Sequence, residues 1–190
     1  MNRAILTVLL ACSAASVAAC GGEEIQQLTA AEAQAIADSL SASLAGAGAR
    51  TTRPLRTPRD AGVAVNGTLA CPVSGHVFSQ GNLFVSCPNP PTPGSCTVSG
   101  VVSVNFGNAV SNVEDCTYAS GLVVDGGVTV MFSGTDLAMK ITFTSILSVA
   151  RKGPTGGLIP LDICLIDLVA RTPAKTLTGS ICGQPVNSTL

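Results

Sequence analysis

Residues 139–149, with the sequence MKITFTSILSV, alternate between two kinds of side chain at every second position. One set is largely apolar, and the other is rich in hydroxyl groups. The first set comprises Met139, Ile141, Phe143, Ser145, Leu147 and Val149, and the second comprises Lys140, Thr142, Thr144, Ile146 and Ser148. Because successive side chains of a β-strand point to opposite faces of a sheet, this period of two predicts a strand with one buried face.

The same alternation recurs on both sides of this stretch. Residues 97–106 and 128–133 repeat it, and residues 176–182 predict a last strand. Asp125-Gly126 lies between two apolar runs and predicts a hairpin turn. Glycines recur within the apolar stretches, which is typical of bulges and bends. We therefore predict an all-β fold, with an antiparallel sheet that is either curved or divided into a two-sheet sandwich.

Residues 158–170, LIPLDICLIDLVA, differ because apolar side chains occupy both faces. One face would carry Leu161, Ile163, Leu165 and Val169, and the other would carry Cys164, Ile166, Leu168 and Ala170. A strand that is apolar on both faces is typical of the centre of a covered sheet. This segment therefore predicts a central strand that is buried on each side; a short helix is the alternative.

One helix is predicted ahead of the sheet, over about residues 30–45. Thr29 and Glu32 have the spacing of a capping box, in which each side chain bonds a backbone amide of the first turn. An apolar stripe follows at steps of four residues, namely Ile36, Leu40 and Leu44. Gly46 and Gly48 provide a stop signal. We expect the stripe to dock on the β domain; pairing with another helix and contact with a membrane are the alternatives.

The distribution of charge divides the chain near residue 60. Residues 20–60 carry nine charged side chains, whereas residues 61–190, about three times as long, carry eleven. Four arginines recur at every third position beside two prolines, which favours extended backbone with the charges on one side: Arg50, Arg53, Arg56 and Arg59. We interpret residues 20–60 as a tether with an Arg/Pro linker and residues 61–190 as the β domain. A solvated spacer is the expected role of the linker, and contact with anionic headgroups is the alternative.

The composition excludes two broad classes of protein. Only 11% of the 190 residues are charged, the net charge is −1 and the mean hydropathy is +0.48. Such an apolar chain is not intrinsically disordered, and it lacks the excess of basic residues that nucleic-acid binding requires. Ser and Thr together number 36, so hydroxyl groups can cover the solvent-facing side of the sheet without many charges.

The first 20 residues predict export. Arg3 precedes an uncharged run that extends to Ala19, and this run is too short in its apolar part to span a membrane. Residues 17–20, Val17-Ala18-Ala19-Cys20, resemble the lipobox of bacterial lipoproteins. The resemblance implies a signal peptide over 1–19, removed before Cys20, and a lipid on the Cys20 thiol. Gly21 in place of aspartate implies an outer-membrane location. An ordinary secretory signal cut after Ala19 is the alternative.

Six cysteines remain in the predicted β domain, and an even number in an exported chain predicts disulfides. No two of them have the close spacing of a metal-binding pair, so we expect no metal site. Among 15 possible pairings, Cys87–Cys96 closes a proline-rich loop and Cys164–Cys182 joins the last two strands. Cys71–Cys116 then remains as the third pair.

Few residues suggest chemistry. His76 is the only histidine, and Ser74 lies two positions before it, but no G-x-S-x-G motif accompanies them. We therefore expect no catalytic residue, no cofactor and no enzymatic activity. The expected function is an interaction or structural module of the cell envelope. The alternatives are a carrier for an apolar ligand or lipid, and a hydrolase that uses His76. The expected partners are the membrane, through the lipid on Cys20, and an envelope protein or apolar ligand, but no nucleic acid.

Overall fold

The computed structural model describes residues 27–50, 61–107, 115–172 and 174–189. The predicted signal peptide over 1–19, the predicted lipid attachment site Cys20 and the linker over 51–60 lie outside these described residues.

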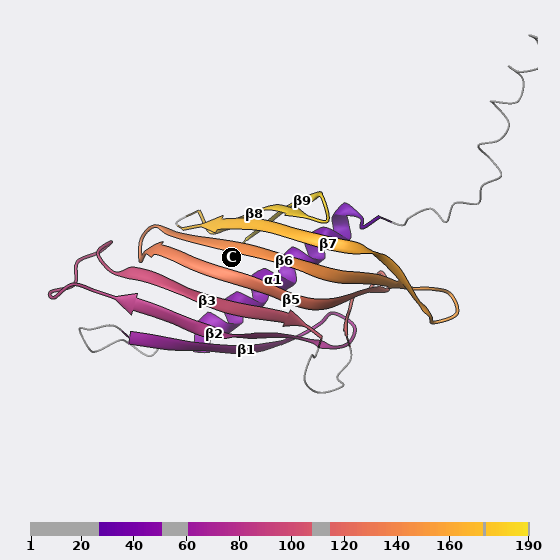
Figure 1. Cartoon of the computed structure of the whole chain (residues 1–190), viewed down its shortest axis with the longest axis horizontal. Helices are drawn as coiled ribbons and strands as arrows, with labels where there is room; N and C mark the ends of the chain where they lie inside the picture. Colours follow the sequence, from indigo (N-terminus) through magenta and orange to yellow (C-terminus); the bar gives the residue numbers. More distant parts are fainter. Residues whose placement is uncertain (1–26, 51–60, 108–114, 173, 190) are drawn as a thin grey trace, which may run out of the picture.

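The described residues form a single antiparallel sheet with one helix, α1 (Ala30–Arg50). The strands are β1 (Ala61–Ala70), β2 (His76–Ser86), β3 (Thr97–Phe106), β4 (Cys116–Thr117), β5 (Leu122–Thr135), β6 (Met139–Lys152), β7 (Leu158–Arg171), β8 (Thr176–Ile181) and β9 (Gln184–Thr189). The order across the sheet is β1-β2-β3-β5-β6-β7-β8-β9 (Figure 1), and the short β4 pairs with β5. The predicted all-β class is confirmed. The strands lie in one open sheet and not in a two-sheet sandwich.

Strand β6 shows why the sheet has one buried face. Ile141, Phe143, Leu147 and Val149 are buried, whereas the alternating residues Lys140, Thr144, Ile146 and Ser148 are exposed. The buried side chains belong to one core that extends over the inner face of the sheet, beneath α1. The outer face points away from the helix, and hydroxyl groups are frequent on it. The period of two in residues 139–149 is therefore the period of burial.

The hairpin turn predicted at Asp125-Gly126 is not present, because β5 continues through it from Leu122 to Thr135. Asp125 pairs with Ser148 of β6, and Gly126 pairs with Phe106 of β3. Gly126 has a φ of 119°, which only glycine adopts readily. Pairing with a neighbour on each side holds the strand together, and the glycine serves as a local bend within it.

Strand β7 departs from its prediction as well. Its inner side is buried, as at Cys164, Ile166 and Leu168, but its outer side is not covered. Ile163 and Leu165 are exposed on that side. The prediction of a strand buried on both faces was therefore wrong, because the only helix of the described part of the chain lies on the other face of the sheet.

Helix α1 begins where the capping box predicts. The Thr29 backbone N–H donates to Glu32 Oε2 at 3.0 Å, and the Glu32 N–H donates to Thr29 Oγ1 at 3.3 Å. The helix ends at Arg50, not near residue 45, so Gly46 and Gly48 do not stop it. A glycine costs a helix only about 1 kcal/mol, and an established helix gains one hydrogen bond for each residue added.

The helix is part of the same folded unit as the sheet. It crosses behind the sheet in Figure 1 and contacts both edge strands, β1 and β9. Ile36 and Leu40 are fully buried in the core. At the β9 edge, Gln34 Nε2 donates to the Asn187 carbonyl at 2.8 Å, and the Asn187 N–H donates to Gln34 Oε1 at 3.1 Å. The Gln34 side-chain amide thus forms hydrogen bonds with backbone groups of the edge strand β9, as a further strand would. The boundary that the charge distribution suggests near residue 60 therefore does not place the helix and the sheet in separate folded units.

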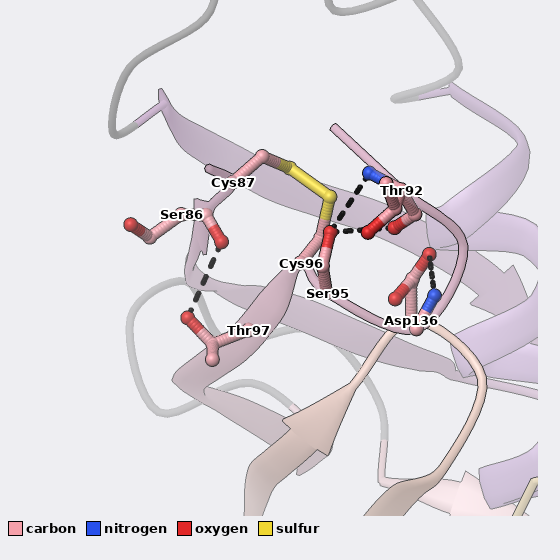
Figure 2. Close-up of a disulfide and its surroundings, with 8 residues drawn as sticks. Ser86, Cys87, Thr92, Ser95, Cys96, Thr97 and Asp136 are labelled. Carbon is pink, nitrogen blue, oxygen red and sulfur yellow. Dashed lines mark hydrogen bonds between the residues drawn. A yellow bond between two sulfur atoms is a disulfide. The ribbon is translucent and has the colours of Figure 1, made fainter. Parts of the chain in front are cut away.

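Three disulfides join Cys71 to Cys116, Cys87 to Cys96 and Cys164 to Cys182, the same pairs that the sequence predicted. Figure 2 shows the Cys87–Cys96 bond, which closes the proline-rich loop between β2 and β3. Within this loop the Thr92 N–H donates to Ser95 Oγ at 3.0 Å, and the Gly94 N–H donates to Asp136 Oδ2 at 3.4 Å (Figure 2). Three disulfides indicate that the protein folds in an oxidising compartment to which it is exported.

Candidate binding surfaces

His76 lies at the start of β2, away from any catalytic arrangement within the described residues. Its ring neighbour is Phe78, with ring centroids 6.0 Å apart. In the described part of the chain, the imidazole makes no hydrogen bond or ion pair with a serine or a carboxylate. The backbone carbonyl of Ser74 instead accepts a hydrogen bond from the Thr117 N–H at 2.9 Å. The structure therefore does not bring His76 and Ser74 together as a nucleophile and its base.

Metal ligands do not gather either. Among the described residues, no three His, Cys, Asp or Glu side chains lie close enough to hold a metal ion. The six cysteines there are all in disulfides, so their sulfurs are not available as thiolate ligands.

Glu32 is a buried carboxylate that connects the start of α1 to the sheet. Arg151 Nη2 of β6 lies 2.8 Å from each of its two carboxylate oxygens. Burial raises the pKa of Glu32, but hydrogen bonds from Thr29, Ser120 and Arg151 outweigh it and hold the pKa below its ordinary value. Because these partners complete the capping box and one interface between helix and sheet, we assign the cluster a structural role.

Tyr118 is a second buried polar group beneath the helix. Its hydroxyl donates to Ser39 Oγ of α1 at 3.0 Å. Burial raises the pKa of Tyr118 to about 12; the hydrogen bond with Ser39 opposes this rise, and the charge of Asp38 adds to it. The phenol is therefore neutral at physiological pH and acts as another tie between helix and sheet.

The outer face of the sheet carries a group of exposed aliphatic side chains, which we call the β6–β7 patch. It consists of Ile146, Ile163 and Leu165, which are 63%, 71% and 64% exposed. Ile146 and Leu165 are cross-strand partners, so their side chains lie side by side. Neighbouring exposed positions on β6 are the hydroxyl residues Thr144 and Ser148. The patch is therefore an apolar surface that is bordered by these hydroxyl residues on β6 and by the exposed Asp167 on β7.

The inner face offers a different feature, which we call the helix-end cavity. It lies between the C-terminal half of α1 and the sheet and has a volume of about 280 Å³. Four of its lining side chains are apolar and only partly buried, namely Leu44, Leu83, Phe132 and Met139. Thr172 and the exposed Lys175 line it as well. The volume is just below the range of about 300–1,000 Å³ that is usual for small-molecule pockets.

Neither surface was anticipated from the sequence. The aliphatic residues of β7 suggested burial on both faces, which is the opposite of what the structure shows. The lining of the helix-end cavity comes from α1, β1, β2, β5, β6 and the turn after β7, so no local pattern marks it.

The chain matches no family model, none of the curated proteins and none of the solved structures. Within the described residues, no helix is both long enough and apolar enough to cross a membrane.

Proposed function

We propose that the protein is a lipoprotein of the cell envelope with a non-enzymatic binding role at the outer membrane. The three disulfides support export, and the lipobox-like residues 17–20 support an anchor on Cys20. The folded part then acts as a rigid module that presents its surfaces to another envelope component.

The observation that carries the binding role is the β6–β7 patch. Solvent-exposed aliphatic side chains that are contiguous, and not scattered singly, mark interaction sites on soluble proteins. Ile146 and Leu165 form such a pair on a sheet, where the backbone fixes their positions. Hydroxyl side chains and one carboxylate, that of Asp167, border this pair, so the complementary partner is an apolar surface with a polar rim on an envelope protein.

Site-specific photocrosslinking in the native envelope tests this proposal. A photoreactive amino acid at position 146 or 165 should yield a discrete crosslinked protein. Position 84 is the matched control, because Phe84 is also an exposed apolar residue but lies on β2. Crosslinks of equal yield and identity from all three positions, or none from 146 and 165, would refute a specific partner at the patch.

The anchor has its own test. The mature N-terminus, examined by mass spectrometry after purification from the envelope, should begin at Cys20 and carry acyl chains. A Cys20→Ala variant should lose membrane association. An unmodified Cys20 at the N-terminus would refute the lipid anchor and would indicate an ordinary secretory signal.

A second candidate function is a carrier for an apolar ligand, and the helix-end cavity favours it. Partly buried Leu44, Leu83 and Phe132 leave apolar surface uncovered between the C-terminal half of α1 and the sheet. An alkyl chain that covers this apolar surface removes both the surface and the chain from water, which is favourable. Binding of decanol to the purified protein, measured by calorimetry, tests this function; its absence would count against a carrier.

A further inference from the structure

The helix-end cavity combines apolar walls with one cation. Helix α1 supplies Leu44, and the sheet supplies Leu83, Phe132 and Met139. Among the described residues that line the cavity, Lys175 is the one that carries a charge, and its side chain is exposed to solvent. A ligand with an apolar tail and an anionic head would complement this arrangement.

We propose that the helix-end cavity binds a single-chain anionic amphiphile, with its alkyl chain between α1 and the sheet and its anionic head at Lys175. This inference rests on the second candidate function, the apolar-ligand carrier, and adds the chemical class of the ligand. The β6–β7 patch lies on the opposite face of the sheet, so both sites can be occupied at once.

The volume of the cavity sets the size of the tail. A water molecule occupies about 30 Å³ in the liquid and a methylene group takes a similar volume, so 280 Å³ accommodates a chain of about nine or ten carbons. The part of the ligand held between α1 and the sheet is therefore one chain of medium length.

The position of Lys175 sets the charge of the head. Lys175 lies in the turn that joins β7 to β8, directly beside the cavity. A hydrogen bond between an ammonium and an ionised acceptor is stronger than one between neutral groups. A carboxylate head at Lys175 therefore binds more tightly than an alcohol on the same chain, and a quaternary ammonium head binds less tightly than either.

Isothermal titration calorimetry with three ligands of equal chain length tests the proposal: decanoate, decanol and decyltrimethylammonium. Residues 21–190, exported so that the disulfides form, contain the whole of the helix, sheet and core described above. We expect decanoate to bind one molecule per chain. Lys175→Met should weaken decanoate about tenfold and leave decanol unchanged, since it removes one charge-assisted hydrogen bond.

Two matched controls locate the effect. Lys140→Met removes a cation from the outer face of β6 and should leave decanoate binding unchanged. Ala45→Phe places a ring on a residue that lines the cavity and should abolish binding of decanoate and decanol. Ala42→Phe places the same ring on an exposed helix residue outside this lining and should not.

The possible outcomes separate the inference from the function on which it rests. If none of the three ligands binds, both the carrier function and the inference fail. If decanol binds as tightly as decanoate and Lys175→Met has no effect, the carrier function stands and the anionic head is refuted. An equal loss with Lys140→Met would indicate nonspecific attraction and would refute a site at Lys175.

Discussion

At the scale of single residues, the buried polar groups of this protein serve to fasten the helix. Tyr118 is the clearest case, because its hydroxyl reaches Ser39 of α1 while its ring is buried in the core. The chain contains one tyrosine and no tryptophan, so the ultraviolet absorbance of the phenolate reports Tyr118 alone.

We predict that a spectroscopic titration of the folded protein places the ionisation of Tyr118 near pH 12. Burial raises its pKa to about 12 from an ordinary value of 10.0, so the neutral phenol stabilises the fold below pH 10 and this contribution is lost as the pH rises through 12. Absorbance at the phenolate band should show a midpoint near 10 in urea. A folded midpoint near 10 would contradict the burial of the Tyr118 phenol beneath α1.

Gly179 shows a residue whose identity is fixed by the neighbouring strand. It lies in β8 with a φ of 145°, and an added Cβ would lie 2.1 Å from the Asp167 carbonyl oxygen of β7. Both the backbone conformation and the close approach of the strands therefore require glycine.

We expect Gly179→Ala to lower the free energy of unfolding by about 2–3 kcal/mol, since the methyl group must displace a paired strand. Gly62→Ala is the matched control, because a Cβ there meets only the Phe84 ring, whose nearest atom lies at 3.8 Å; its effect should stay within about 0.5 kcal/mol. Urea denaturation measures both. Equal effects of the two substitutions would show that the strands near Gly179 can separate at little cost.

At the scale of elements, the start of the helix could be predicted and its end could not. The capping box of Thr29 and Glu32 is a local signal with a definite geometry, and the structure contains it. The end depends on small differences in helix propensity at Gly46 and Gly48, which packing and propagation outweigh. The link from Glu32 to Arg151 spans 119 residues, so the sequence alone gave no indication of it.

We predict that Glu32→Gln makes stability less sensitive to acid. The folded pKa of Glu32 is lower than its ordinary value of 4.5, so the ionised carboxylate stabilises the fold above that pH. This contribution is lost as the pH falls through the lowered folded value. At pH 7 the variant should lose about 1–3 kcal/mol, because a hydrogen bond to a charged group is removed from Arg151.

Urea unfolding between pH 7 and pH 3 measures the difference between the two proteins, which should shrink as the solution becomes acidic. Thr144→Ala, on the exposed outer face of β6, removes no titratable group; it is the control and should leave the difference from wild type nearly constant. A constant difference for Glu32→Gln would mean that the carboxylate is not specifically stabilised in the fold.

At the scale of the whole molecule, the strands of the sheet could be predicted better than what covers each face of the sheet. Alternation in residues 139–149 correctly marks which side chains of β6 are buried, because one face of the sheet meets the core. The same reasoning failed for Leu165 of β7, since an apolar side chain shows only that burial is favourable and not that a covering element exists. The helix-end cavity was not predictable because its lining residues come from the helix, four strands and a turn that lie far apart in the sequence.

The disulfides close loops of very different length, and this difference gives the last prediction. Cys71–Cys116 spans 45 residues, Cys164–Cys182 spans 18 and Cys87–Cys96 spans 9. In the chain-entropy model, replacing each pair by alanines costs about 4, 3 and 2.5 kcal/mol respectively, because a longer loop restricts the unfolded chain more. Cys116 and Cys164 are also fully buried, so their loss adds a packing defect to the first and the second variant. Urea denaturation of the three double variants should therefore rank them in that order of destabilisation. If the variant without Cys87–Cys96 were the least stable, loop entropy would not control stability, and the hydrogen bonds between its loop and Asp136 would be the stronger constraint.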